Sequence, residues 1–208
     1  MNVLPTRDRE RQIFDLGHQY VACIDEVGRG ALAGPAVIGI VVVQSVMMDY
    51  PDGIRDSKLI SARMREKLLP GIHSWAVDVS IGEASPAEID RVGIMAALGL
   101  AAQRALENLN CQPDAILLDG NINYLTAVSR VPVFTEIKGD MNCVGIAAAS
   151  IVAKCERDDY MRGLDVECPG YAFDSNKGYS SSAHIKALQI RGVSSHHRTS
   201  WNLPGLIP

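Results

Sequence analysis

Two apolar runs joined by a glycine-rich link restrict the fold of this chain more than any other feature. Residues 21–25 (VACID) and 36–43 (AVIGIVVV) are almost entirely apolar, and the ten residues between them include three glycines. Short apolar runs of this kind are typical of buried strands, and an acidic, glycine-rich link between them is typical of an ordinary β-hairpin. We therefore expect a sheet that contains this hairpin.

The rest of the chain alternates between helical and strand-like apolar patterns, without a repeat or a low-complexity linker. Ser85 and Glu88 of the SPAE segment form a capping box with proline at the first helical position, so a helix is expected to begin there. The patterns predict further strands at 75–81, 115–119 and 131–138, and further helices at 61–69, 94–109, 144–161 and Ser182–Arg191. This order predicts an α/β fold with a sheet of mixed direction, followed by an irregular tail that carries the last helix.

Length and composition indicate one soluble globular domain. The chain has 208 residues, of which 47% are hydrophobic and 21% charged, which is enough apolar material for a core. The charged amino terminus lacks a secretory signal, and the longest nearly apolar run, residues 31–43, is too short to span a bilayer. Five scattered cysteines without a C-x-x-C pair indicate reduced thiols, so we expect a cytoplasmic protein that does not associate with membranes.

Charge is unevenly distributed along the chain. The net charge is −4, yet no acidic residue occurs from residue 175 onward, which leaves 16 basic and 24 acidic residues, a net −8, before it. An acidic body with a basic tail suggests that metal ions bind one part and a polyanion binds the other. A basic tail that is merely solvated explains the same distribution, so both interpretations stay open here.

Three acidic residues fall at or just after the ends of expected strands. Asp25 ends the first strand, Asp119 ends the strand 115–119, and Asp140 follows the strand 131–138 in the link KGDMN. Carboxylates at the ends of separate strands of one sheet can converge on a small volume. Their mutual repulsion would then be relieved by a divalent cation between them.

Glu26, directly after Asp25, raises a geometric difficulty. Neighbouring side chains on a regular strand point to opposite faces of the sheet, so both acids can serve one site only if the strand breaks at Glu26. Gly28 and Gly30 are where such a break is expected, because glycine adopts backbone conformations that other residues avoid.

A set of short motifs then identifies a family. DEVGRG, RDSK, LLDG, KGD, AAASIVAK, RD and NKGY occur in this order, followed by histidine, Ala-Leu, glycine and His-Arg in the tail. Each motif is common by itself, but the ordered set closely resembles bacterial ribonuclease HII, the type 2 ribonucleases H. The resemblance runs from about residue 21 to residue 201, which is nearly the whole chain.

The resemblance implies a fold and an activity. The fold would be a ribonuclease H-like mixed β-sheet flanked by helices, with a catalytic core at residues 1–165 and a small, mainly helical substrate-binding extension at 166–208. The activity would be endonucleolytic hydrolysis of the RNA strand of RNA/DNA hybrids, including cleavage on the 5′ side of a single ribonucleotide embedded in duplex DNA. The products would carry a 3′-hydroxyl and a 5′-phosphate, as suits removal of misincorporated ribonucleotides.

The resemblance also implies roles for individual residues. The metal-binding and catalytic acids would be Asp25, Glu26, Asp119 and Asp140. The substrate-binding residues would be Gly28, Arg29 and Gly30 at the ribose, Tyr179 against the sugar at an RNA to DNA junction, and Ser57, Lys58, Ser150, Lys154 and Lys177 at the phosphates or in support of the site. Asp158 and His184 would support the site. The serines after Tyr179 depart from the family pattern, which puts the detail of that loop in doubt.

The implied cofactors are two Mg²⁺ or Mn²⁺ ions, which suit phosphodiester hydrolysis without a nucleophilic side chain. His184, His196 and His197 are expected to contact phosphate or serve the structure rather than act as acid or base. Two other classes use similar acids, namely a two-metal DNA nuclease or integrase-like enzyme and a non-catalytic metal-containing nucleic-acid-binding module. The expected partners are RNA/DNA hybrid and ribonucleotide-containing DNA. The sequence indicates no protein partner, and we expect a monomer.

Overall fold

The computed structural model describes residues 4–46 and 49–205, and a five-stranded mixed sheet in the order β3-β2-β1-β4-β5 forms its centre. β1 (Tyr20–Val27) pairs antiparallel with β2 (Ala36–Gln44), and β2 pairs antiparallel with β3 (Asp78–Ala84). β4 (Ala115–Asp119) lies parallel to β1, and β5 (Val133–Glu136) lies parallel to β4. The predicted hairpin and the mixed direction of the sheet are confirmed.

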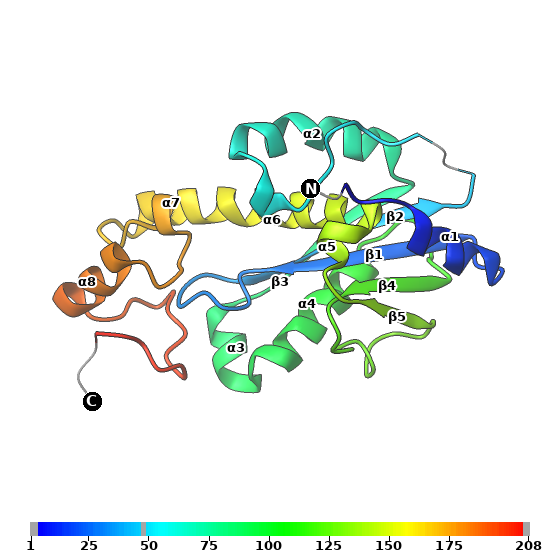
Figure 1. The fold of residues 1–208 in the computed structure, drawn as a ribbon. Helices are drawn as coiled ribbons and strands as arrows, with labels where there is room; N and C mark the ends of the chain where they lie inside the picture. Colours follow the sequence, from blue (N-terminus) through cyan, green and yellow to red (C-terminus); the bar gives the residue numbers. More distant parts are fainter. Residues whose placement is uncertain (1–3, 47–48, 206–208) are drawn as a thin grey trace.

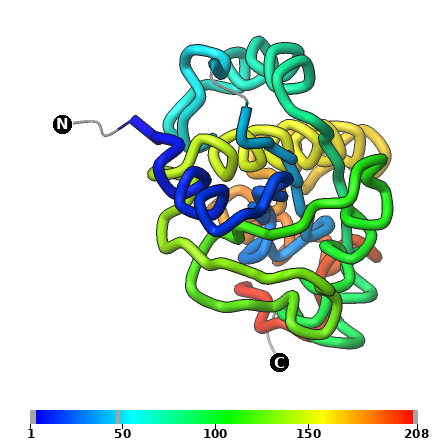
Figure 2. Tube along the Cα trace, turned by 90° about the vertical axis from the view of Figure 1, so that its right-hand side faces the viewer, coloured from blue at the N-terminus to red at the C-terminus, as the bar shows by residue number. Residues whose placement is uncertain are grey.

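Helices cover both faces of the sheet (Figure 1). The long helix α6 (Val144–Glu167) and, outside it, α2 (Ala62–Trp75) lie on one face, whereas α3 (Pro86–Val92) and α4 (Ile94–Glu107) lie on the other. Figure 2, which views the molecule from the end that carries α1 (Asp8–Asp15), shows the same layers from top to bottom. The remaining helices are η1 (Ser57–Leu59), α5 (Gly139–Asn142), α7 (Phe173–Asn176) and α8 (Ser182–Arg191).

Alternation along the strands divides the core into two clusters. Val21 and Cys23 of β1 face α6, while Ala22 and Ile24 face α4, and β2 divides its side chains in the same way. Gly82 of β3 allows α4 to pack closely, because a methyl group there would collide with the α4 backbone. This alternation fixes the face on which each acid of β1 and β4 can lie.

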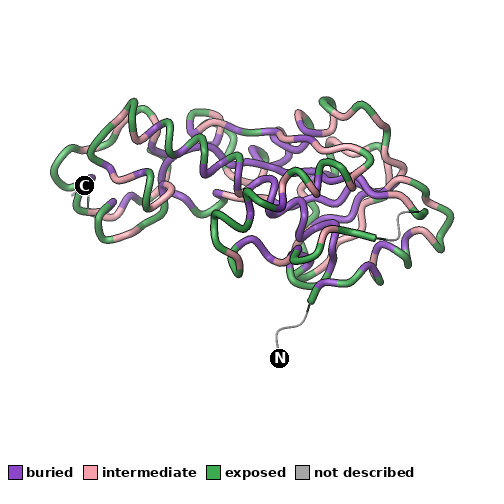
Figure 3. The backbone as a smooth tube through the Cα atoms, turned by 90° about the horizontal axis from the view of Figure 1, so that it is seen from above, coloured by how far each residue is buried: buried purple, intermediate pink, exposed green. Residues whose placement is uncertain are grey.

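The carboxyl-terminal part lies at one end of the molecule, around the far end of α6 (Figure 1). A third apolar cluster joins it to the body, and its members include Leu32, Met161, Phe173 and Leu188. Figure 3 shows buried backbone running from the sheet region into this end. The division into residues 1–165 and 166–208 stays a prediction, and the last three residues of the tail lie outside the described residues.

Several expected boundaries were wrong: α6, expected at 144–161, continues to residue 167, and β5 covers only residues 133–136 of the expected 131–138. The helix expected at 61–69 continues to Trp75, through Pro70, because Leu68 and Ile72 on its inner side are both buried and outweigh the lost hydrogen bond of proline. As a result, the strand expected at 75–81 is displaced to Asp78–Ala84. The capping box at Ser85 and Glu88 is confirmed. Among the described residues, no helix is both long and apolar enough to cross a membrane.

Candidate active site

Asp25 and Asp119 lie side by side at the ends of two parallel strands. The ladder between β1 and β4 pairs Ile24 with Leu118, so the next residue on each strand is an aspartate. Both aspartates follow the alternation toward the α6 face, because Val21 and Leu117 belong to the cluster on that face. The parallel pairing therefore brings together two carboxylates that are 94 positions apart in the sequence.

Asp140 joins them from α5. This short helix begins after Lys138, which has a left-handed backbone with φ 57°. The Oδ1 atom of Asp119 accepts hydrogen bonds from the backbone N–H of Gly139, at 2.7 Å, and of Asp140, at 3.4 Å. The expected link KGDMN is thus a helical turn, and the carboxylate of Asp119 stabilises its first turn.

The expectation that the strand breaks at Glu26 was wrong. β1 stays paired through Glu26, opposite Ile38, to Val27. Although the strand continues, Glu26 lines the same cavity as Asp25, and its Oε2 accepts a hydrogen bond from the Tyr124 hydroxyl at 3.2 Å. The turn begins at Gly28, which has φ +83° and no room for a methyl group beside the carbonyl of Pro35.

Burial and mutual repulsion perturb two of the acids. Burial raises the pKa of Asp25 well above its usual range, and the nearby carboxylates of Asp119, Glu26 and Asp140 raise it further. Burial also raises the pKa of Asp119, and Asp140 adds to the effect, although the Gly139 N–H opposes it. The acids therefore form an electrostatically coupled group whose full ionisation is unfavourable without positive charge.

A cavity of about 300 Å³ opens at two of these acids, Asp25 and Glu26, whereas Asp119 and Asp140 are not among its lining residues. It is lined by Asp25, Glu26, Val27, Ser57, Lys58, Ser150, Lys154 and Tyr179. Seven of these eight residues are predicted site residues, contributed by β1, η1, α6 and the loop after α7. A larger hollow of about 590 Å³ between α4 and residues 127–131 has Glu107 as the one acid among its lining residues, so size alone does not identify the site.

Basic side chains surround the acids. The Nζ atom of Lys58 lies 2.9 Å from Oδ2 of Asp140. Burial opposes the charge of Lys58, but the hydrogen bond to Asp140 outweighs it and raises the pKa of the lysine. The Ser57 hydroxyl meets the Ser150 hydroxyl at 2.8 Å, which ties η1 to α6. Lysines beside carboxylates at a cavity mouth suit a substrate that carries phosphates.

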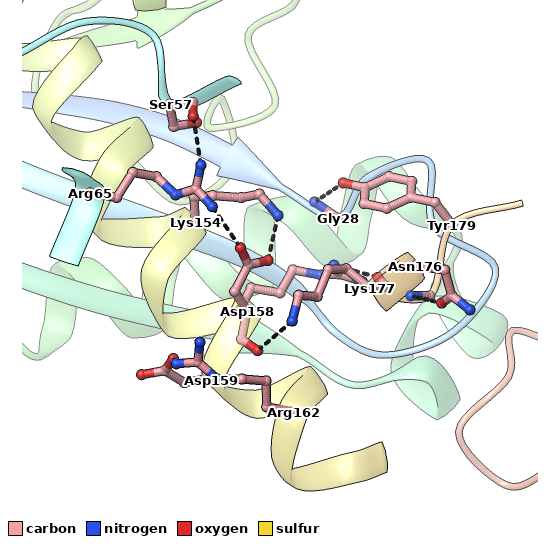
Figure 4. Close-up of polar contacts among 12 residues, drawn as sticks. Gly28, Ser57, Arg65, Lys154, Asp158, Asp159, Arg162, Asn176, Lys177 and Tyr179 are labelled. Carbon is pink, nitrogen blue, oxygen red and sulfur yellow. Dashed lines mark hydrogen bonds and ion pairs between the residues drawn. The ribbon is translucent and has the colours of Figure 1, made fainter. Parts of the chain in front are cut away.

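A second ion-pair network lies beside this cavity on α6 (Figure 4). Asp158 is buried and pairs with Lys154 and with Arg65, whose Nη2 lies 3.0 Å from Oδ2 of Asp158. Arg65 also donates to the carbonyl oxygen of Ser57, at 2.9 Å. Asp158 is therefore a buried and doubly paired side chain, and is not merely solvated on the surface of the helix. Its supporting role in the site stays a prediction.

Tyr179 bridges the tail to the turn after β1. Its hydroxyl accepts a hydrogen bond from the backbone N–H of Gly28 at 3.2 Å (Figure 4). Its carbonyl oxygen lies 2.9 Å from Nδ1 of His184, which is fully buried. His184 therefore lies outside the cavity and holds the backbone of Tyr179 in place.

The turn itself has two different glycines. Gly28 requires its positive φ, whereas Gly30 has no positive φ and no atom within 4 Å of the position that a methyl group would take. Arg29 between them is exposed, and its Nη1 lies 3.3 Å from Oε1 of Glu26. Folding thus explains glycine at position 28 but gives no local reason for glycine at position 30.

The acids fit divalent cations in the kind of donor that they offer, since Mg²⁺ and Mn²⁺ prefer carboxylate oxygens. In the described part of the chain, however, no three His, Cys, Asp or Glu side chains form a ready-made metal site. Protein donors engage the carboxylates instead: Tyr124 and Arg29 bind Glu26, and Lys58 binds Asp140.

Two groups of residues depart from the sequence-based picture. Lys177 lies away from the cavity and contacts the carbonyl oxygen of Asp158 at 3.5 Å and Asp174 at 3.4 Å. Arg198 of the basic tail is fully buried, so it cannot serve as a surface contact for a polyanion. Four residues hold the site together in ways that the sequence did not predict: Arg65, Tyr124 and Arg157, which had no predicted role, and Arg198, which was expected only as part of the basic tail. The two last lie within the quoted RD and HR motifs, whereas nothing local distinguishes the other two.

Known proteins match this chain over nearly its whole length. A family model described as Ribonuclease HII matches residues 22–203. A curated ribonuclease HII from Streptomyces griseus is 44% identical, covering 98% of this chain and 86% of that protein. The crystal structure of ribonuclease H2 from Pyrococcus horikoshii OT3 has a TM-score of 0.71 and 25% identity, over 88% of this chain and 94% of that one. Bst-RNase HIII in complex with Mn²⁺ shares the fold, with a TM-score of 0.64 at 20% identity, over 84% of this chain and 63% of that one. The chain therefore belongs to the ribonuclease HII family, whose members are ribonuclease H endonucleases that hydrolyse the RNA strand of RNA/DNA hybrids.

Proposed function

We propose that this enzyme cuts RNA/DNA hybrids and also cuts on the 5′ side of a single ribonucleotide within duplex DNA, leaving a 3′-hydroxyl and a 5′-phosphate. The observation that carries the proposal is the convergence of two acids, two lysines and Tyr179 on one cavity of about 300 Å³, namely Asp25, Glu26, Lys58 and Lys154 beside the tyrosine. Acids and lysines alone would serve any two-metal nuclease. Tyr179, bonded to Gly28 at the mouth of this cavity, adds an aromatic ring where the sugar next to the cut would lie.

Asp25, Glu26, Asp119 and Asp140 are the proposed ligands of two Mg²⁺ or Mn²⁺ ions. Such ions supply an activated water and stabilise the leaving oxygen. In support, Asp25 and Asp119 are the acids whose pKa burial and repulsion raise, so nearby positive charge stabilises their ionised forms most. The carboxylates of Asp140 and Glu26 must exchange their present protein donors to join the set.

Lys58 then takes a second role. Once its ammonium leaves Asp140, the side chain remains at the cavity lined by Ser57 and Ser150 and can contact a phosphate of the substrate. Lys154, on the same wall of this cavity, is a second phosphate contact. Lys177, which lies farther out on the same side, is proposed to contact a phosphate outside the scissile one.

The ribose is proposed to be read by the backbone at Arg29 and Gly30. The carbonyl oxygens of Gly28 and Arg29 accept hydrogen bonds from Arg198, and the N–H of Gly28 donates to Tyr179. The groups of this turn that can face a 2′-hydroxyl are therefore the N–H groups of Arg29 and Gly30. Glycine at position 30, which folding does not require, lets the nucleic acid backbone approach closely.

The proposal is tested with three labelled duplexes, each incubated with and without Mg²⁺. The first is a continuous RNA/DNA hybrid, the second is DNA with one ribonucleotide, and the third is the same DNA with a deoxyribonucleotide at that position. We expect metal-dependent cleavage of the first two and none of the third. Sequencing of the products should place the cut 5′ to the ribonucleotide.

Each alternative gives a different result. Cleavage of the all-deoxy duplex at the same rate would identify a two-metal DNA nuclease and refute the ribose-reading turn. Binding without cleavage of any duplex would identify a nucleic-acid-binding module. Cleavage of the continuous hybrid alone would refute the single-ribonucleotide activity while leaving the family activity intact.

A further inference from the structure

Two arginines are buried in this protein without an acidic partner. Arg157 of α6 and Arg198 of the tail each have 0% relative exposure. No carboxylate among residues 4–46 and 49–205 lies within ion-pair distance of either guanidinium. A buried cation that lacks a counter-charge is costly, and burial lowers the pKa of both, that of Arg198 to about 10. Something other than ion pairing must therefore explain them.

Both arginines bind backbone carbonyls of the same turn, residues 28–35, which we call the ribose link. Arg198 donates from Nη2 to Gly28 at 2.6 Å, from Nη1 to Arg29 at 2.9 Å and from Nε to Gly34 at 3.3 Å. Arg157 donates to the other end of the link, from Nε to Pro35 at 2.9 Å and from Nη2 to Ala33 at 3.1 Å. The planar guanidinium, with five donors, suits this use.

Arg157 differs from Arg198 in one respect, since it also reaches the segment that carries Tyr179. Its Nη1 donates to the carbonyl oxygen of Lys177 at 2.8 Å, and its guanidinium carbon lies 5.3 Å from the centre of the Tyr179 ring. Lys177 has a left-handed backbone with φ 51°, a conformation unfavourable for a side chain other than glycine. Arg157 thus holds a strained turn next to the tyrosine.

These contacts make Arg157 a side-chain connection between two parts of the substrate surface, in addition to the backbone hydrogen bonds that join them. The ribose link approaches from β1, and Tyr179 approaches from a turn about 150 residues later in the chain. Three hydrogen bonds join them directly. The Gly28 N–H donates to the tyrosine hydroxyl at 3.2 Å, and the N–H groups of Leu32 and Ala33 donate to the carbonyl oxygen of Gly178, next to Tyr179, at 2.8 and 3.2 Å. Arg157 adds three donors and a cation–π contact that fix both parts against one helix.

We propose that Arg157 is a positioning residue that sets the spacing between Tyr179 and the ribose link, and so determines the preference for a ribonucleotide-to-DNA junction over continuous hybrid. The inference rests on the proposed function, because it assumes that Tyr179 lies on the sugar that follows the ribonucleotide. A continuous hybrid has a ribose at that position as well and depends less on the ring. Arg198 holds the link alone, so it does not set this spacing.

The test is the junction ratio, defined as kcat/KM on single-ribonucleotide DNA divided by kcat/KM on continuous hybrid. Arg157→Lys keeps the charge but loses the planar set of donors, and it should lower the junction ratio about tenfold, the effect of losing one charged hydrogen bond. Arg198→Lys is the matched control, since it removes equally buried donors to the same link. It should lower both rates together and leave the junction ratio unchanged.

Several outcomes would overturn the inference. One is an unchanged junction ratio in Arg157→Lys. Another is a fall of the junction ratio in Arg198→Lys that equals the fall in Arg157→Lys. A wild-type enzyme that does not cut single-ribonucleotide DNA would instead refute the proposed function, which separates the two failures. In Tyr179→Ala, which has no ring to position, adding Arg157→Lys should lower the junction ratio no further, and an additional fall of similar size would also refute the inference.

A spectroscopic measurement covers the case in which Arg157→Lys does not fold. The Nε–H resonance of Arg157 should differ between the wild-type protein and Tyr179→Ala, because the aromatic ring lies near the guanidinium. The Nε–H resonance of Arg198 should stay in place, since its nearest ring is that of Trp201. Unmoved Arg157 resonances would show that the contact with Tyr179 does not exist in solution, which refutes the inference.

Discussion

Replacement of His197 by asparagine should flatten the dependence of the unfolding free energy on pH between about pH 6.5 and pH 4. The Nε2 atoms of His184 and His197 lie 3.0 Å apart, and both rings are buried. The backbone N–H of Ser194 donates to Nδ1 of His197, and Nδ1 of His184 faces the carbonyl oxygen of Tyr179. A backbone N–H can only donate and a carbonyl can only accept, so both rings are neutral, with the shared proton on His197.

The magnitude follows from the pKa of His197. Burial, followed by repulsion from His184, lowers this pKa from 6.5 to about 4. Between these values the unfolded chain binds a proton that the folded protein does not. Stability is therefore complete above pH 6.5 and is lost as the pH falls towards 4, by about 3 kcal/mol for a shift of about 2.5 pKa units.

The measurement is urea unfolding at successive pH values across this window, with fluorescence of Trp75 and Trp201 as the signal. Asp25 and Asp119 also titrate abnormally, but their raised pKa values act in the opposite direction, stabilising the folded state as the pH falls. The informative quantity is thus the difference between the variant and wild-type curves, in which the carboxylates cancel.

His73 provides the matched control, because it is an exposed histidine on α2. His73→Asn should give a curve parallel to wild type. His197→Asn should be less stable than wild type at neutral pH, where the pair is intact, and should approach it as the pH falls. Parallel curves for His197→Asn and wild type, within about 1 kcal/mol, would refute the neutral pair.

Three further predictions concern the active site. Asp25→Asn, Asp119→Asn and Asp140→Asn, which each replace a proposed metal ligand, should abolish cleavage and largely spare hybrid binding. Near wild-type cleavage rates in Mg²⁺ for two of these three variants would refute the ligand set. Gly30→Ala should have the melting temperature of the wild type but cleave at least about tenfold more slowly. Gly28→Ala should lower the melting temperature, because position 28 has a positive φ. Equal activity of Gly30→Ala and wild type would refute close approach of the substrate at this turn. Lys186→Gln, on the exposed side of α8, should reduce the salt dependence of hybrid binding by about one counterion without changing kcat, and an unchanged slope would favour the solvated-tail interpretation.

Local signals in the sequence predicted most of the elements. The apolar runs of β1 and β2, the capping box at Ser85 and the helix Ser182–Arg191 each depend on residues within one turn or one strand of each other. The ordered motifs identified the family for the same reason, since each is contiguous. The end of α2 was missed because burial of Ile72 against the rest of the protein, rather than local propensity at Pro70, decides it.

The sequence by itself determined which residues are available for the site, and the tertiary structure decided how they face one another. Asp25 and Glu26 are adjacent in sequence, but only the folded structure shows that β1 stays paired with β2 through Val27 and that Glu26 bonds Tyr124, 98 positions away. Arg198 looked like part of a basic surface, but it lies buried against Gly28, 170 positions away. Contacts across such separations depend on packing of the whole chain, because no local hydrogen bond or periodicity encodes them. Only the folded structure could therefore reveal that these side chains shape the turn at the active site.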